Sequence, residues 1–203
     1  MLFNKINETI KGLEIDSIPE ERKEILQPLI DYIQNKMELG EHVNLNFICT
    51  HNSRRSHLAQ IWAQTMVSFF NINKVFCFSG GTEATALFAS AKETLEKAGF
   101  VFEITTEEEN PRYQIFFSEE EQPLVGFSKK YDHSSNPSSY FAAIMTCSQA
   151  DENCPFISGA EKRIPITYED PKLYDNTPQE IEKYKERSLQ IATEMYYVFS
   201  EID

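Results

Sequence analysis

Positively charged residues are outnumbered in this sequence. Lysine and arginine together number 19, against 32 aspartates and glutamates, so the formal net charge is −13 at pH 7. A chain with this balance is repelled by nucleic-acid phosphates and by anionic lipids, and neither is expected as a partner. The same field opposes small anions, so any anion site must be built from local donors.

Long apolar runs are also missing. No segment approaches the roughly 20 apolar residues of a membrane-spanning helix. The first residues do not combine a basic stretch with an apolar core, so we expect no signal peptide and a cytoplasmic location. The chain has four cysteines: Cys49, Cys77, Cys147 and Cys154. In a reducing compartment they should not form structural disulfides.

The length of 203 residues predicts one domain with an appendage. Residues 1–42 predict a helical extension, made of a short helix over 2–13 and a second helix with Ser17 as N-cap and Gly40 at its end. This extension should pack on the main domain or on a second subunit. Residues 43–203 form the main domain.

Apolar strands alternate with helices from residue 43. We expect strands at 43–48, 74–78 and 100–104, with helices over 56–70 and 83–98 between them. This order predicts a doubly wound α/β sheet. Two further strands, at 140–146 and 164–167, precede a last helix that a capping box at Thr177 to Glu180 should start.

Residues 105–139 interrupt this alternation and are predicted to be an insertion. Two short strands, at 112–117 and 124–127, indicate a β-hairpin that extends one edge of the sheet. The acidic stretches around the hairpin indicate solvated faces.

The segment Asn46 to Ala59 carries the clearest chemical pattern. It runs from an apolar strand through a polar loop, opened by Cys49, into a helix, and Arg55 follows Cys49 after five intervening residues. Such a loop points backbone N–H groups inward, and a guanidinium can bind two oxygens of a tetrahedral oxyanion. The thiol shares this positive field and should be a nucleophilic thiolate. The alternative is a buried structural cysteine beside a solvated Arg-Arg pair.

Two further loops follow strands and should meet the Cys49 loop, because carboxyl ends of parallel strands share one edge. One contains Cys147 and Cys154, and the other contains Asp170. A carboxyl group there could protonate a departing oxygen, although Asp170-Pro171 could also be a simple turn. Cys77 lies in an apolar run and is expected in the core.

The residues Phe47 to Ser56 resemble the first loop of the low-molecular-weight protein tyrosine phosphatases, and still more that of the thioredoxin-coupled arsenate reductases of the same fold. The spacing of Cys147 and Cys154, with Pro155 next, is similar to a cysteine pair of those reductases. The resemblance covers residues 43 to 202. It implies three layers around a mainly parallel four-stranded sheet, with no metal or other cofactor.

The resemblance also implies roles. Cys49 is the nucleophile, Asp170 the general acid, and Ser56 a thiolate-stabilising hydroxyl. Cys147 attacks Cys49 to release arsenite, and Cys154 resolves that bond and leaves a Cys147–Cys154 disulfide for thioredoxin. The oxyanion is bound by the loop, whose residues are Thr50, His51, Asn52, Ser53, Arg54, Arg55 and Ser56.

Three residues depart from the family pattern. His51 replaces a glycine at a loop position that favours positive φ. Arg54 replaces a second loop cysteine and adds a positive charge near the anion. Gln60 replaces an acidic residue that helps to bind potassium in some reductases, so that ion is not expected.

Three functions stay open on the sequence. The first is arsenate reduction through the three cysteines with thioredoxin as partner. The second is hydrolysis of phosphotyrosine or another phosphomonoester by Cys49, Arg55 and Asp170. The third is a non-catalytic module that senses oxyanions.

Overall fold

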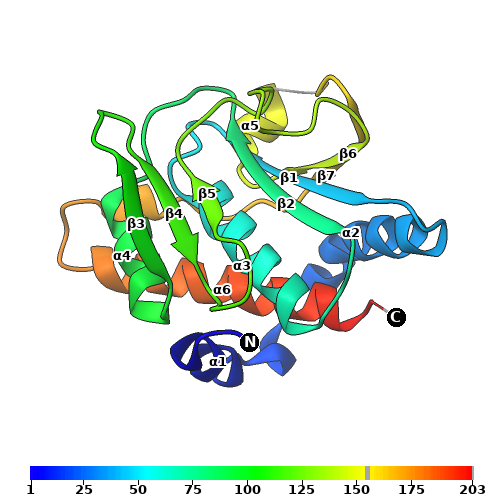
Figure 1. Ribbon diagram of the computed structural model, residues 1–203, viewed down its shortest axis with the longest axis horizontal. Coiled ribbons are helices and arrows are strands. Elements are labelled where there is room, and N and C mark those ends of the chain that lie inside the picture. The colour runs from blue at the N-terminus through cyan, green and yellow to red at the C-terminus, as the bar shows by residue number, and fades with distance from the viewer. Residues whose placement is uncertain (154–155, 203) are drawn as a thin grey trace.

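The computed structural model describes residues 1–153 and 156–202, and its centre is a four-stranded parallel sheet (Figure 1). The strand order is β2 (Val75–Gly81), β1 (Val43–Cys49), β6 (Phe141–Met145) and β7 (Ala160–Pro165). All three pairings are parallel. The predicted α/β class and the parallel four-stranded sheet are confirmed.

The last strand lies earlier in the chain than predicted. It covers 160–165, whereas the sequence indicated 164–167. The physical reason is that β7 is an edge strand whose first polar residues stay largely exposed, so its start has no apolar signal.

Long helices cover one face of this sheet. α3 (Arg55–Phe69) and α6 (Glu180–Ser200) lie beneath it, with α4 (Ala89–Ala98) beside α6 (Figure 1). Trp62 of α3 is fully buried, and its indole N–H donates to Ser188 Oγ of α6 at 2.9 Å. The other face is covered by α5 (Ser148–Asn153) and by segments that pack around Phe141 and Met145.

A second, three-stranded sheet corrects the prediction for the middle of the chain. β3 (Val101–Thr106), β4 (Arg112–Phe116) and β5 (Leu124–Gly126) pair in antiparallel fashion. The expected hairpin is therefore present, but it extends β3 and not the parallel sheet. The assignment of 100–104 to the parallel sheet was wrong, because a strand's own residues do not identify its neighbour.

The N-terminal extension is helical as expected: α1 (Asn4–Lys11), the 3-10 helix η1 (Ile15–Ser17) and α2 (Glu20–Glu38). Its apolar residues belong to the main core, among them Ile6, Ile10, Leu26, Leu29 and Ile33. None of the helices in the described residues is both long and apolar enough to cross a membrane.

Three predicted helix starts are corrected. Pro19 is the N-cap of α2, and Ser17 instead ends η1. α4 begins at residue 89, since 83–88 is irregular. α6 begins at Glu180, so the proposed capping box at 177–180 forms the turn before the helix.

Candidate active site

The Cys49 loop lies between the carboxyl end of β1 and the start of α3, as predicted. Cys49 pairs in register with Gly81 at the end of β2. A Cβ atom on Gly81 would lie 2.7 Å from Thr50 O and 2.8 Å from Asn52 N. Only glycine allows the loop to approach β2 this closely.

The sulfur of Cys49 is surrounded by donors. It accepts a hydrogen bond from Asn52 N at 3.2 Å and lies 3.1 Å from Ser56 Oγ. Ser56 Oγ also accepts from Asn52 Nδ2 at 2.8 Å, so its own proton is free to point toward the sulfur. These contacts hold the Cys49 sulfur at the base of the loop.

Asn52 has the left-handed backbone conformation in this loop, with φ of 45°. The expectation that His51 would take the positive φ was therefore wrong by one residue. Asparagine tolerates this conformation better than most residues. Its Oδ1 accepts from Lys129 N at 2.9 Å, while the half-exposed His51 lies 3.6 Å from Glu83.

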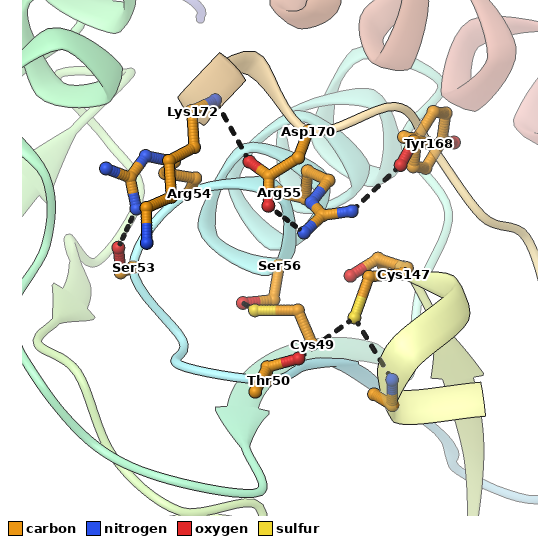
Figure 2. Close-up of polar contacts among 12 residues, drawn as sticks. Cys49, Thr50, Ser53, Arg54, Arg55, Ser56, Cys147, Tyr168, Asp170 and Lys172 are labelled. Carbon is orange, nitrogen blue, oxygen red and sulfur yellow. Dashed lines mark hydrogen bonds and ion pairs between the residues drawn. The ribbon is translucent and has the colours of Figure 1, made fainter. Parts of the chain in front are cut away.

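Arg55 is turned toward the candidate acid. Its Nη1 donates to Tyr168 O at 2.9 Å, and its Nη2 forms an ion pair with Asp170 (Figure 2). The other oxygen of Asp170 accepts from Lys172 N at 3.1 Å. The chain thus brings Asp170 to the edge of the loop, where the topology placed it.

Arg54 belongs to a separate set of contacts. Its Nη2 lies 2.6 Å from Asp175 Oδ2, its Nε donates to Tyr184 OH at 2.5 Å, and its Nη1 donates to Ser53 Oγ at 3.0 Å. Its guanidinium carbon lies 3.8 Å from the centre of the Phe88 ring. These contacts leave Arg54 less available to an anion than the sequence suggested.

Cys147 lies two residues beyond the end of β6 and comes next to the loop from the side of α5 (Figure 2). It is 1% exposed, its sulfur lies 3.5 Å from Thr50 Oγ1, and Ala150 N donates to it at 3.4 Å. It shares a buried cluster with Cys49. Cys154 lies outside the described residues. Cys77 is in the main core as expected, and burial raises the pKa of its thiol.

The loop and the acid enclose a small surface pocket. It is lined by Cys49, Thr50, His51, Ser53, Arg54, Arg55 and Asp170. Of the remaining predicted site residues, Asn52 and Ser56 are buried behind the sulfur and Cys147 adjoins Thr50. Within the described residues, no group of three His, Cys, Asp or Glu side chains could hold a metal ion.

Two buried basic residues next to the loop were not predicted. Lys129 is 4% exposed, and burial lowers the pKa of its amine to about 8. His57 is fully buried in the first turn of α3. Burial, followed by the charge of Lys129, lowers the pKa of His57 to about 3. Lys129 sits at the start of a polar loop and gave no sequence signal, whereas the first-turn position of His57, beside Ser56, could have indicated that it lies behind the loop.

The fold is similar to solved structures, although neither a family model nor a curated protein matches the sequence. A structure described as an arsenate reductase in the phosphate-binding state has a TM-score of 0.51 at 17% identity, covering 79% of this chain and 99% of its own. An Archaeoglobus fulgidus arsenate reductase has a TM-score of 0.51 at 15% identity, covering 77% and 98%. A low-molecular-weight protein tyrosine phosphatase from T. tengcongensis has a TM-score of 0.51 at 16% identity, covering 78% and 96%. The chain therefore has the fold that low-molecular-weight protein tyrosine phosphatases and arsenate reductases share.

Proposed function

We propose that this chain is an enzyme whose Cys49 thiolate attacks a tetrahedral oxyanion, and that the oxyanion is arsenate. The observation that carries the choice of arsenate is the second buried thiol at the loop. Cys147 lies 3.5 Å from the hydroxyl of Thr50, the residue next to the nucleophile. Hydrolysis of a phosphate ester needs one thiol. Reduction of arsenate needs two electrons, which two thiols supply when they form a disulfide.

The proposed reaction begins at Cys49. Its thiolate forms a bond to arsenic, while an oxygen leaves as water after protonation by Asp170. The Cys147 thiolate then attacks the Cys49 sulfur and forms a disulfide. The electron pair of the sulfur–arsenic bond stays on arsenic, which departs as arsenite.

The cycle closes by thiol exchange. Cys154 attacks Cys147, which returns the Cys49 thiolate and leaves a Cys147–Cys154 disulfide. An external dithiol, for which we propose thioredoxin, reduces this disulfide and is itself oxidised. Exchange of this kind requires the third sulfur to approach in line with the disulfide, so the segment from 148 to 153 must move during the cycle.

Arsenate turnover with thioredoxin as reductant tests this proposal. We expect Cys49→Ser and Cys147→Ser each to abolish arsenite release. The matched control is Cys77→Ser, which removes a thiol from the core and should keep arsenate turnover if the chain folds. Full arsenate turnover in Cys147→Ser would show that the relay is wrong.

Phosphomonoester hydrolysis is the second candidate, and the position of Asp170 favours it. The carboxylate lies at the pocket together with Cys49 and Arg55, where it could protonate an ester oxygen. This function predicts rapid hydrolysis of an aryl phosphate that is lost in Cys49→Ser and kept in Cys147→Ser. Side-by-side assays with arsenate and an aryl phosphate therefore separate the two functions. Activity with neither substrate would favour the non-catalytic module.

A further inference from the structure

The two consecutive arginines of the loop bind opposite ends of one short turn. η2 (Pro171–Tyr174) has Asp170 as its N-cap and Asp175 as its C-cap. Arg55 forms an ion pair with Asp170, and Arg54 forms one with Asp175. The turn that carries the candidate acid is therefore attached to the Cys49 loop twice.

The two ion pairs differ in whether they can persist when substrate binds. Arg55 is the residue expected to bind the oxyanion, so it must give up Asp170 when the substrate arrives. Arg54 has three hydrogen-bond partners and a ring stacked against it, and its side chain is 12% exposed. A guanidinium held by so many neighbours keeps its position when an anion enters.

Asp175 is held equally firmly. One of its oxygens lies 2.6 Å from Arg54 Nη2, and the other accepts from Tyr184 OH at 2.7 Å. Its side chain is 14% exposed. Tyr184 is fully buried in α6 and stacks on Phe88, with ring centres 5.6 Å apart. The Arg54–Asp175 pair thus connects the loop to the helical layer as well as to η2.

We propose that Arg54 is a positioning residue: it holds η2 against the loop through Asp175, so that Asp170 stays over the pocket once Arg55 has turned to the oxyanion. Arg54 does not itself bind the oxyanion in this scheme. The inference rests on the proposed function only for the role of Asp170, because the attachment itself is a property of the fold.

Leaving-group dependence is one test. An acid matters more for a poor leaving group than for a good one. For Arg54→Gln and Asp175→Asn, we expect the ratio of kcat/KM for p-nitrophenyl phosphate to that for phenyl phosphate to rise about tenfold or more, in the direction of Asp170→Asn. In the double variant, this ratio should rise no further than in either single variant. The matched control is Lys92→Gln, which removes a cation that pairs with Glu96 and lies over the Phe102 ring of β3. It should leave the ratio unchanged.

Two further measurements do not require turnover. Affinity for inorganic phosphate should be unchanged in Asp175→Asn and Arg54→Gln. Amide hydrogen exchange of a peptide covering 168–176 should be faster by about tenfold or more in both variants, most of all with phosphate bound. Thermal unfolding of each variant shows whether the rest of the chain stays folded.

The outcomes are distinct. If Arg54→Gln weakens phosphate binding about tenfold or more while Asp175→Asn does not, Arg54 binds the oxyanion and the inference is wrong. Unchanged exchange and an unchanged ratio in both variants would also overturn it. If the wild type turns over neither arsenate nor aryl phosphate, the proposed function fails, and the exchange and phosphate measurements still decide whether Arg54 holds η2.

Discussion

Asn52 supplies the left-handed turn of the loop and takes part in three hydrogen bonds, with Cys49, Ser56 and Lys129. We expect Asn52→Ala to lower the free energy of unfolding by about 2–4 kcal/mol, from backbone strain and unpaired buried groups. It should also abolish turnover. Urea unfolding measures the first effect.

Two variants separate the contribution of the backbone conformation from that of the side-chain hydrogen bonds. Asn52→Gly relieves the backbone strain but does not restore the lost hydrogen bonds. Its free energy of unfolding should be about 1 kcal/mol higher than that of Asn52→Ala. Asn71→Ala changes an exposed asparagine with φ of 55° and should show the backbone cost alone. Equal stability of Asn52→Ala and wild type would mean that the loop does not depend on this residue.

His57 gives the molecule a predictable response to acid. Its pKa is about 3 in the folded chain, against an ordinary value of 6.5, because it is buried and near Lys129. Between these values the unfolded chain binds a proton that the folded chain does not. Stability therefore falls as pH drops from about 6.5 toward 3, by at most about 1.4 kcal/mol per pH unit from this group.

The variant His57→Leu removes this contribution and fills the site with an apolar side chain of similar size. Urea unfolding across this pH range should show a flatter dependence than in the wild type. As a control, His133→Leu changes a half-buried histidine outside the loop and keeps His57, so it should keep the acid response that His57 causes. A wild-type slope in His57→Leu would show that other groups dominate acid unfolding.

At the scale of elements, the close packing of the Cys49 loop on β2 depends on the glycine at position 81. A methyl group at Gly81 would lie against the backbone of Thr50 and Asn52. We expect Gly81→Ala to cost about 1–3 kcal/mol and to displace the loop, with loss of phosphate binding. Gly12→Ala is the matched control, because its nearest neighbour would be at an ordinary 3.5 Å. If phosphate still bound Gly81→Ala with wild-type affinity, the close approach would not matter to the site.

The elements around the site could be predicted from sequence because their signals are local. β1 and β2 are rich in apolar residues, and the Cys49 loop follows from the order strand, loop, helix. The partner of β3 could not be predicted, since pairing depends on contacts across the chain. The same holds for Arg54, whose partners Asp175 and Tyr184 are 121 and 130 residues away. An arginine in the loop predicted an anion ligand, and only the fold shows that Asp175 and Tyr184 already bind its guanidinium.

At the scale of the whole molecule, a largely buried ion pair connects the N-terminal extension to the main domain. Arg22 of α2 donates to both oxygens of Glu194 in α6, at 2.9 and 2.8 Å, and the Glu194 side chain is 3% exposed. The guanidinium also lies 4.9 Å from the centre of the Tyr168 ring, and Tyr168 O accepts from Arg55. The extension thus contacts the residue that holds the pocket arginine. The boundary between residues 42 and 43 remains a prediction.

The Arg22–Glu194 pair allows a test of whether the extension and the main domain unfold together. Arg22→Met should cost about 3–5 kcal/mol, because it leaves the carboxylate of Glu194 buried without its cationic partner. Adding Glu194→Leu removes that buried charge and should restore most of the loss. Lys183→Met, which breaks an exposed pair with Glu186, should cost much less than Arg22→Met. A single urea transition in all these variants would mean that extension and domain unfold as one unit, whereas a separate early transition in Arg22→Met would mean that the extension detaches by itself.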